Sequence, residues 1–360
     1  MRLIRYENRR TDMTKHLFWR NILNYFKYAC SGCAIIFNII LILLVVFRSP
    51  KSLGAYKYLM IYISAFDLFY SLWDAATEPI VYSYDSAFVV FRHCKDSIFN
   101  REVSFYIVLI YCGCFTFSLA CFGVHFVYRY GTLNNNFRER YLSGKKICIV
   151  FLIPFVYGCW WIAISAIMFH YDDFTDAYLE FGIREDFGYD SRDTAAMVIL
   201  FYWPNSDGKL HPNWNTIATM SNVWFMCFTS MFCVGYCGIK CYRSITKAFA
   251  ITQTQSKTAR NLQHQLFKAL VIQTLIPAVL MYLPLFFVFM LPIFNINIPY
   301  ASSCISATIS IYTAIDPLPS MFIIRTYRKT IIKALIKVLL LCNALPQDHV
   351  PRAATSTAPE

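Results

Sequence analysis

Three carboxylates occur in one stretch, about residues 55–79, that is otherwise dominated by apolar residues. Asp67, Asp74 and Glu78 are separated by seven and four residues, so a helix would carry all three on one face. Because a charge inside a membrane-spanning helix is costly, such residues mark an ion site, a proton relay or a pairing partner. We expect Asp67 near the middle of the helix, and Asp74 and Glu78 nearer its outer end, where they could simply face water.

Two further polar residues interrupt other apolar runs. Asn38 lies in the first of these runs, and Asp316 directly precedes Pro317 in the last one. A helix bundle that gathered Asn38, Asp67 and Asp316 would form a polar centre able to hold a cation or to share a proton. The alternative is a hydrogen-bond network that only fixes the packing of the helices.

Arg129 follows a stretch, residues 104–128, that carries no formal charge. It is either a switch residue that changes partner when helices move, or an ordinary basic residue that the dipole favours at a helix end. His125, one turn before it, is expected to be a hydrogen-bonded interior residue rather than a ligand. Cys30 and Cys33 form a CxxC pair with no second pair, so we predict no metal site.

The elements that must position these residues are long apolar helices. The chain is 57% hydrophobic and only 15% charged, whereas about a quarter of a soluble domain is charged. About 20 apolar residues cross a bilayer as a helix, so the pattern predicts an all-α membrane protein with seven spans. They cover approximately residues 28–47, 55–79, 104–130, 147–169, 214–241, 266–291 and 300–324. The apolar segment 80–91 either continues the second span or folds over the outer surface.

The distribution of Lys and Arg sets the orientation. With the amino terminus outside, the inner loops and tail hold 20 basic residues and the outer loops hold six. The amino-terminal segment adds seven to the outside, which argues the other way, and translation from Met13 would leave three of them. The net charge of +12 falls in short gaps between apolar runs, which favours an inner-leaflet surface over nucleic acid. The predicted organisation is an extracellular segment 1–27, a membrane domain 28–324, an amphipathic helix 325–342 along the inner leaflet and a disordered cytoplasmic tail 343–360.

The long outer loop, residues 170–213, is acidic and contains no cysteine, so it cannot form a disulfide with Cys94. Near its end, two aromatic-rich arms flank Ser206-Asp207-Gly208, which favours a tight β-hairpin. Such a hairpin could cover a pocket from above; the alternative is a solvated acidic loop. At the other end of the chain, Cys342 follows the amphipathic segment and is a candidate for palmitoylation.

A pocket for a small molecule is expected between the outer halves of the third, fifth, sixth and seventh spans. Pro277 and Pro284 would bend the sixth span, about which its inner end could swing. Five residues lie at the depth of this pocket, although lipid contact or core packing is more common for any one of them: Tyr111, Cys112, Phe115, Met281 and Phe286.

These landmarks together resemble the rhodopsin-like plan of G-protein-coupled receptors. Asn38 and Asp67 match its first-helix asparagine and second-helix aspartate, and in that class the aspartate binds sodium. Tyr128-Arg129-Tyr130 stands where an acidic-Arg-Tyr triplet is usual, so the usual acidic neighbour of Arg129 is missing. Pro277 matches the sixth-helix proline, and Asp316-Pro317 opens the seventh-helix motif, whose final tyrosine is missing.

Longer strings resemble the nematode serpentine chemoreceptors of the Str class, which includes the diacetyl-type odorant receptors. They cover roughly residues 25–335 and include SPKSLGAYKYLMIYISAFDLFYS, CGCFTFSLACFGVHFVYRYGTLN and IDPLPSMFIIRTYRK. The resemblance implies an olfactory receptor in the ciliary plasma membrane of a chemosensory neuron. It would detect a small odorant and signal through a heterotrimeric G protein.

Two other classes of protein, a transporter or channel and an enzyme, agree less well with the sequence. A transporter or cation channel could use the acidic face of the second span, but the chain shows no inverted repeat and an odd number of spans. No GxSxG, HExxH or glycine-rich phosphate loop is present, so we predict neither an enzyme nor a cofactor other than the sodium ion.

Overall fold

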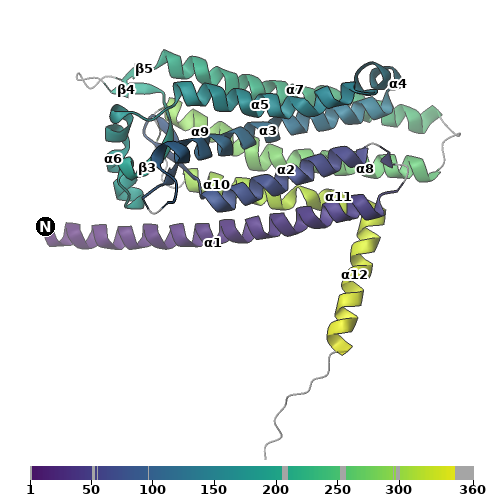
Figure 1. Ribbon diagram of the computed structural model, residues 1–360, viewed down its shortest axis with the longest axis horizontal. Coiled ribbons are helices and arrows are strands. Elements are labelled where there is room, and N and C mark those ends of the chain that lie inside the picture. The colour runs from purple at the N-terminus through teal and green to yellow at the C-terminus, as the bar shows by residue number, and fades with distance from the viewer. Residues whose placement is uncertain are drawn as a thin grey trace, which may run out of the picture.

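The computed structural model describes residues 2–344, except for 51–52, 55, 96, 205–209, 252–256, 295 and 297–300. Long helices lie side by side in one elongated bundle (Figure 1). Its helical segments are α1 (Arg2–Arg48), α2 (Tyr56–Thr77), α3 (Arg101–Leu133), α5 (Lys146–Met168), α7 (Trp214–Ile251), the series α8 (Lys257–Pro277), η4 (Ala278–Tyr282) and α9 (Leu283–Ile293), and the pair α10 (Ala301–Ile315) and α11 (Pro317–Ile323). Each of these seven segments contains most or all of one predicted span, and we number them helix one to helix seven in chain order, so that helix three is α3, helix six is α8, η4 and α9, and helix seven is α10 and α11.

Five of the segments contain helices long and apolar enough to cross a membrane on their own. They are Ile22–Arg48, Arg101–Leu133, Lys146–Met168, Trp214–Ser244 and Phe267–Ile293. The segment Ala307–Ile323 also qualifies when it is joined to the helix that follows it, although the two are bent by 99°. The remaining segment, α2, carries the buried Asp67 and Asp74 and packs against α1 and α3.

Helix α3 is the centre of the bundle. In its most apolar window 83% of the residues are buried, compared with 22% in the corresponding window of α5. Gly113 of α3 and Gly158 of α5 allow these helices to approach closely, because a Cβ at Gly158 would lie 3.1 Å from the Gly113 carbonyl oxygen. The outer end of α3 begins at Asn100, whose side chain accepts a hydrogen bond from the Val103 amide.

A three-stranded antiparallel sheet closes the outer end of the bundle (Figure 1). β1 (Ile80–Tyr84) and β2 (Ala87–His93) form a hairpin, and β3 (Thr194–Leu200) pairs with β2. Residues 80–91 therefore fold over the outer surface and do not continue the second span. Pro79 follows the end of α2, and the positive φ angles of Glu78 (47°) and Asp85 (46°) mark the two turns of the chain.

The long outer loop, residues 170–213, contains a helix and strands, which the alternative of a solvated acidic loop did not include. It contains α6 (Asp173–Phe187), which opens with a capping box between Asp172 and Thr175 and ends at Gly188 with φ 73°. The predicted hairpin is present: β4 (Tyr202–Pro204) pairs with β5 (Leu210–Pro212), while its tip lies outside the described residues. Sequence patterns had not predicted α6, which packs on the outer face of the sheet through Leu179 and Ile183.

The inner end carries α4 (Asn135–Phe137) and α12 (Arg325–Ala344). Helix α12 leaves the bundle at a wide angle, and exposed apolar side chains such as Leu335 and Leu339 are spaced four residues apart along it (Figure 1). This geometry agrees with the predicted amphipathic helix. Cys342 falls within α12, but its side chain and the tail from 345 onward lie outside the described residues.

The start of α1 and the helix α12 lie at opposite ends of the bundle (Figure 1), as an odd number of crossings requires. The structure differs from the predicted boundary at residue 28, because α1 begins at Arg2 and runs without a break to Arg48.

Candidate functional site

An apolar cavity of about 60 Å³ lies beneath the sheet, between the outer halves of the helices. Of the five predicted pocket residues, Tyr111, Cys112 and Phe115 line it. The other lining residues are Thr116 of α3, Trp161 of α5, Val223 of α7, Leu285, Val288 and Phe289 of helix six, Ile309 of α10, and Val81, Phe88, Val90 and Met197 of the sheet. The sheet thus supplies part of the wall, a contribution that the sequence patterns did not reveal.

The two residues predicted from helix six do not line this cavity. Met281 is buried, but it packs deeper in the bundle against Phe122 and Tyr312. Phe286 is 57% exposed on the outside of the helix. The physical reason is η4, a π-helical turn that follows Pro277 and shifts the register of the residues after it, so that Val288 and Phe289 face the cavity instead.

The cover of the cavity is connected to the outer end of helix six. The rings of Phe88 on β2 and Phe289 on α9 meet edge to face with centroids 5.0 Å apart. The Tyr202 hydroxyl of β4 donates to the Ile293 carbonyl at 2.8 Å. A change in the cavity can therefore reach helix six through both the sheet and the loop.

Arg101, at the start of α3, holds the outer loop in place. Its Nε donates to the Thr194 carbonyl at 2.7 Å, and its guanidinium forms a 2.5 Å ion pair with Asp176 of α6. The same group lies 3.7 Å from the centroid of the Tyr171 ring. The cysteines whose side chains are described are all free, including Cys94, so in the described part of the chain Arg101 joins helix three to the loop without a disulfide.

The predicted polar centre is partly assembled. Asp67 of α2 and Asp316, between α10 and α11, are both buried, and their carboxyl groups lie within hydrogen-bonding reach of one another. Asn38 is fully buried and donates to the carbonyl oxygens of Ala34 (3.0 Å) and Thr313 (3.4 Å), one turn before Asp316. The structure thus brings Asp67 and Asp316 together and fixes Asn38 to the neighbouring turn of helix seven.

Several buried oxygens near this centre have no hydrogen-bond partner within the described part of the chain. They are Asn38 Oδ1, Asp67 Oδ2 and Gln273 Oε1. Gln273 belongs to α8 and donates from Nε2 to the Asp316 carbonyl at 3.1 Å. Carboxylate and amide oxygens are the donors that hard cations prefer, so the residues present fit a sodium ion.

At the inner end of α3, Arg129 is 1% exposed, which excludes an ordinary surface cation at a helix end. Its guanidinium lies 5.6 Å from the centroid of the Tyr56 ring on α2. The Tyr56 hydroxyl is 2.5 Å from His125 Nε2, which confirms that His125 is a hydrogen-bonded interior residue. Tyr56 therefore links Arg129 and His125, a role that its position near the start of a span did not predict.

Helix six is bonded to its neighbours on both sides of the bend at Pro277. Above the bend, the Tyr282 hydroxyl lies 2.9 Å from Ser230 Oγ of α7, which in turn donates to the Leu119 carbonyl of α3. Below it, Gln265 Oε1 accepts from the Arg325 amide at 3.0 Å. Pro317 forms the first turn of α11, so the break in helix seven falls directly at Asp316.

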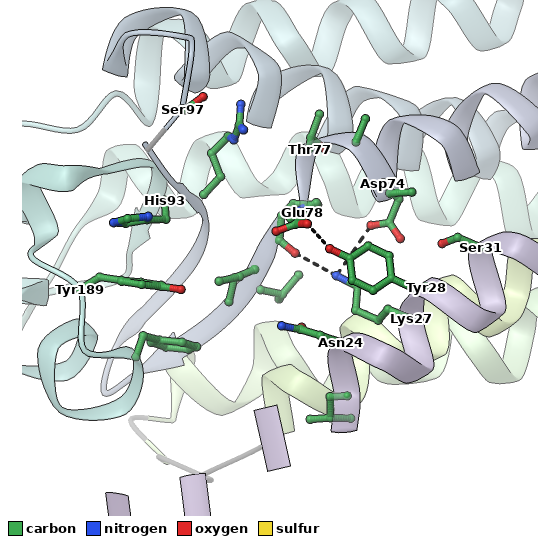
Figure 2. Close-up of a pocket in the computed structure, with 18 residues that line it drawn as sticks. Asn24, Lys27, Tyr28, Ser31, Asp74, Thr77, Glu78, His93, Ser97 and Tyr189 are labelled. Carbon is green, nitrogen blue, oxygen red and sulfur yellow. Dashed lines mark hydrogen bonds and ion pairs between the residues drawn. The ribbon is translucent and has the colours of Figure 1, made fainter. Parts of the chain in front are cut away.

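A second, polar cavity of about 410 Å³ lies between α1, α2 and the β1–β2 hairpin (Figure 2). Asp74 faces this cavity and is only 6% exposed, with Lys27 Nζ at 3.9 Å and Ser310 Oγ at 3.1 Å from its carboxylate. The expectation that Asp74 simply faces water is therefore wrong. Glu78 is exposed, as expected, and accepts a hydrogen bond from the Tyr28 hydroxyl.

The sequence is similar to those of known proteins over most of its length. The family described as serpentine type 7TM GPCR chemoreceptor Str matches residues 23–332. A relative from Caenorhabditis elegans, G-protein coupled receptor str-217, is 35% identical over 291 residues, which is 81% of this chain and 83% of the relative. Serpentine receptor class r-10 of the same organism is 28% identical over 82% of this chain and 85% of its own length. The chain is therefore a member of the Str family of serpentine, seven-transmembrane G-protein-coupled chemoreceptors.

Proposed function

We propose that this receptor detects a small odorant in the apolar cavity and signals through a heterotrimeric G protein from the ciliary plasma membrane of a chemosensory neuron. The observation that carries the proposal is the convergence of α3, helix six and the sheet on one covered apolar cavity. A volatile molecule would gain free energy mainly by burying its apolar surface there, because the surface of the cavity is almost entirely apolar.

The cavity volume sets a requirement on the ligand. A cavity that binds benzene has a volume of about 150 Å³, so this cavity of about 60 Å³ must widen to hold most odorants. A ligand that fits the widened cavity better than the closed one shifts the receptor toward the widened state by that difference in affinity. Because Phe289 contacts the sheet on one side and belongs to helix six, widening would displace the outer part of that helix.

Movement of helix six would be transmitted to the inner end across the bend at Pro277 and η4. The bonds that would have to change are Tyr282–Ser230 above the bend and Gln273–Asp316 and Gln265–Arg325 below it. Arg129, held over Tyr56 in this arrangement, would then meet the G protein. Asp67, Asp316 and Asn38 would hold a bound sodium ion, whose positive charge would favour the packed arrangement.

The arrangement of α2 does not favour the alternative of a channel. The carboxylates of α2 have separate partners: Asp67 contacts Asp316, whereas Asp74 contacts Lys27 and Ser310. A cation path would need these groups to line one continuous opening.

A cell-based screen tests the proposal. The chain is expressed with a calcium or cyclic-nucleotide reporter, and small volatiles are applied. For an active volatile we expect Phe289→Ala, in the cavity wall, to change potency at least tenfold, and Phe286→Ala, on the exposed face, to leave it within about twofold at equal surface expression. Equal effects of the two variants would contradict the assigned cavity, and a ligand-evoked current that persists when G-protein signalling is blocked would favour the channel.

A further inference from the structure

The polar cavity between α1, α2 and the β1–β2 hairpin has no part in the proposed function. Its volume of about 410 Å³ falls in the range of small-molecule sites, roughly 300–1,000 Å³. Figure 2 shows Lys27, Tyr28, Asp74 and Glu78 grouped at one side of it, while His93 and Tyr189 lie at the other.

The acidic side of the cavity is compensated by the protein itself. Lys27 Nζ lies 3.9 Å from Asp74 and donates to the Pro79 carbonyl at 3.2 Å. Ser310 donates to the other oxygen of Asp74, and the Tyr28 hydroxyl donates to Glu78 (Figure 2). Each carboxylate therefore has a partner within the protein, and Lys27 is the charged group beside Asp74 Oδ1, which makes no hydrogen bond among the described residues.

Arg92, on the wall of the same cavity, is in the opposite situation. It is part-buried on β2 opposite Ala195, and its Nε and Nη1 atoms are buried without a hydrogen-bond partner among the described residues. No ion pair found in that part of the chain includes Arg92. An arginine keeps its charge at any physiological pH, and a buried charge without a partner is costly. Arg92 is therefore a cation in the wall of this cavity that pairs with no described carboxylate, and the cavity has the volume for a small anion.

We propose that this cavity binds a small organic carboxylate from the outer side of the membrane, with its carboxylate on the Arg92 guanidinium. The planar fork of an arginine matches the two oxygens of a carboxylate. The body of the ligand would lie against Ile80, Val81 and the Tyr189 ring, which stacks on His93 with centroids 4.2 Å apart. The volume provides room for roughly a dozen water-sized groups of about 30 Å³.

This site goes beyond the proposed function, because it takes a different chemical class at a different place. It is tested on the purified full chain in nanodiscs of zwitterionic lipid, without a G protein, by thermal unfolding in the presence of benzoate, benzamide or inorganic phosphate. We expect benzoate to raise the melting temperature. Benzamide should leave it unchanged because it lacks the negative charge, and phosphate should leave it unchanged because it lacks an apolar ring. A shift with benzamide or phosphate that equals the benzoate shift, or no benzoate shift, would overturn the proposal.

Variants locate the effect. Arg92→Gln should weaken benzoate affinity at least tenfold, while the unliganded variant melts at or above the temperature of the parent because a partnerless charge has been removed. Lys95→Gln removes a charge from an exposed side chain of the same loop and should leave the benzoate shift intact. Ala75→Phe places a large side chain in the cavity and retains Arg92, so it should abolish the benzoate shift. This variant tests the site even if Arg92→Gln does not fold. Retention of the shift in Ala75→Phe would contradict the site, whereas loss of odorant signalling in cells would concern the proposed function alone.

Discussion

The Arg101 guanidinium lies 2.5 Å from the Asp176 carboxylate and so joins helix three to the outer loop by charge and hydrogen bonding. The two residues are 75 positions apart, and both side chains are mostly buried, at 26% and 10% exposure. At this place a non-covalent contact fixes the cover of the ligand cavity relative to the central helix.

Arg101→Ala is therefore expected to destabilise the outer loop by about 2 kcal/mol, because it removes charge-assisted hydrogen bonds and leaves Asp176 buried without its partner. The measurement is thermal unfolding of the purified chain together with proteolysis of residues 170–213. Lys95→Ala is the matched control, since the Lys95–Asp193 pair is exposed and worth little. Equal losses in the two variants would show that Arg101 is not the anchor.

Asp67→Asn should remove the response of the receptor to sodium. In the parent we expect a higher melting temperature in sodium chloride than in choline chloride, because sodium would be held by oxygens that otherwise lack partners. The variant should melt at the same temperature in both salts, since the amide is neutral, and it should keep its fold because an amide can donate to Asp316. Glu185→Gln, at an exposed carboxylate, should retain the parent's difference; a difference that persists in Asp67→Asn would rule out sodium at this centre.

Ser230→Ala should raise signalling in the absence of ligand. Ser230 connects Tyr282 of helix six to the Leu119 carbonyl of helix three, so its loss weakens the packed arrangement by about 1 kcal/mol, or roughly fivefold in the ratio of states. The basal output of the G-protein reporter at equal surface expression measures the change. Ser221→Ala is the control on the same helix, because Ser221 is exposed and bonds only to its own turn at Ala218. Unchanged basal output in Ser230→Ala would mean that this bond does not restrain helix six.

Gly182→Val should separate α6 from the sheet. A Cβ at Gly182 would lie 2.6 Å from Cδ2 of Tyr84 and 2.7 Å from the Tyr82 hydroxyl, so the helix or both rings must move. Overpacking of this kind costs about 1–3 kcal/mol, and surface expression and loop proteolysis would report it. Gly235→Ala provides the contrast, since nothing lies within 4 Å of its Cβ and alanine is expected to strengthen α7 slightly. A normal loop in Gly182→Val would contradict the close packing.

The comparison of prediction and structure is clearest on the cavity wall. Tyr111, Cys112 and Phe115 were chosen by depth along a regular helix and do line the cavity, because α3 is unbroken from Arg101 to Leu133. The same reasoning failed for Met281 and Phe286, because η4 changes the number of residues per turn after Pro277. A proline predicts a bend, but whether a π-helical turn forms at the bend depends on how the helix packs against its neighbours.

The sheet shows a second limit. The seven residues of β3 are all buried, so they form an apolar run without the alternation that distinguishes a half-exposed strand. The composition of residues 80–91 allows either a helix or a hairpin. The hairpin forms because β2 pairs with β3, which is more than 100 positions away in the sequence. Arg92 and Lys27 were not singled out from the sequence, because a part-buried cation without a partner looks like any other loop arginine until its surroundings are known.

The sequence by itself determined the bundle and its family, and it predicts the side of the membrane on which each loop lies. A helix in lipid must satisfy its own backbone hydrogen bonds, so an apolar run of sufficient length has one available structure, and Lys and Arg orient it. Only the tertiary structure decided that Asp67 meets Asp316, that Arg101 meets Asp176 and that Arg92 meets no partner in the described chain. These contacts join side chains from distant segments, whose separation depends on how helices tilt, kink and pack rather than on the residue types along any one of them.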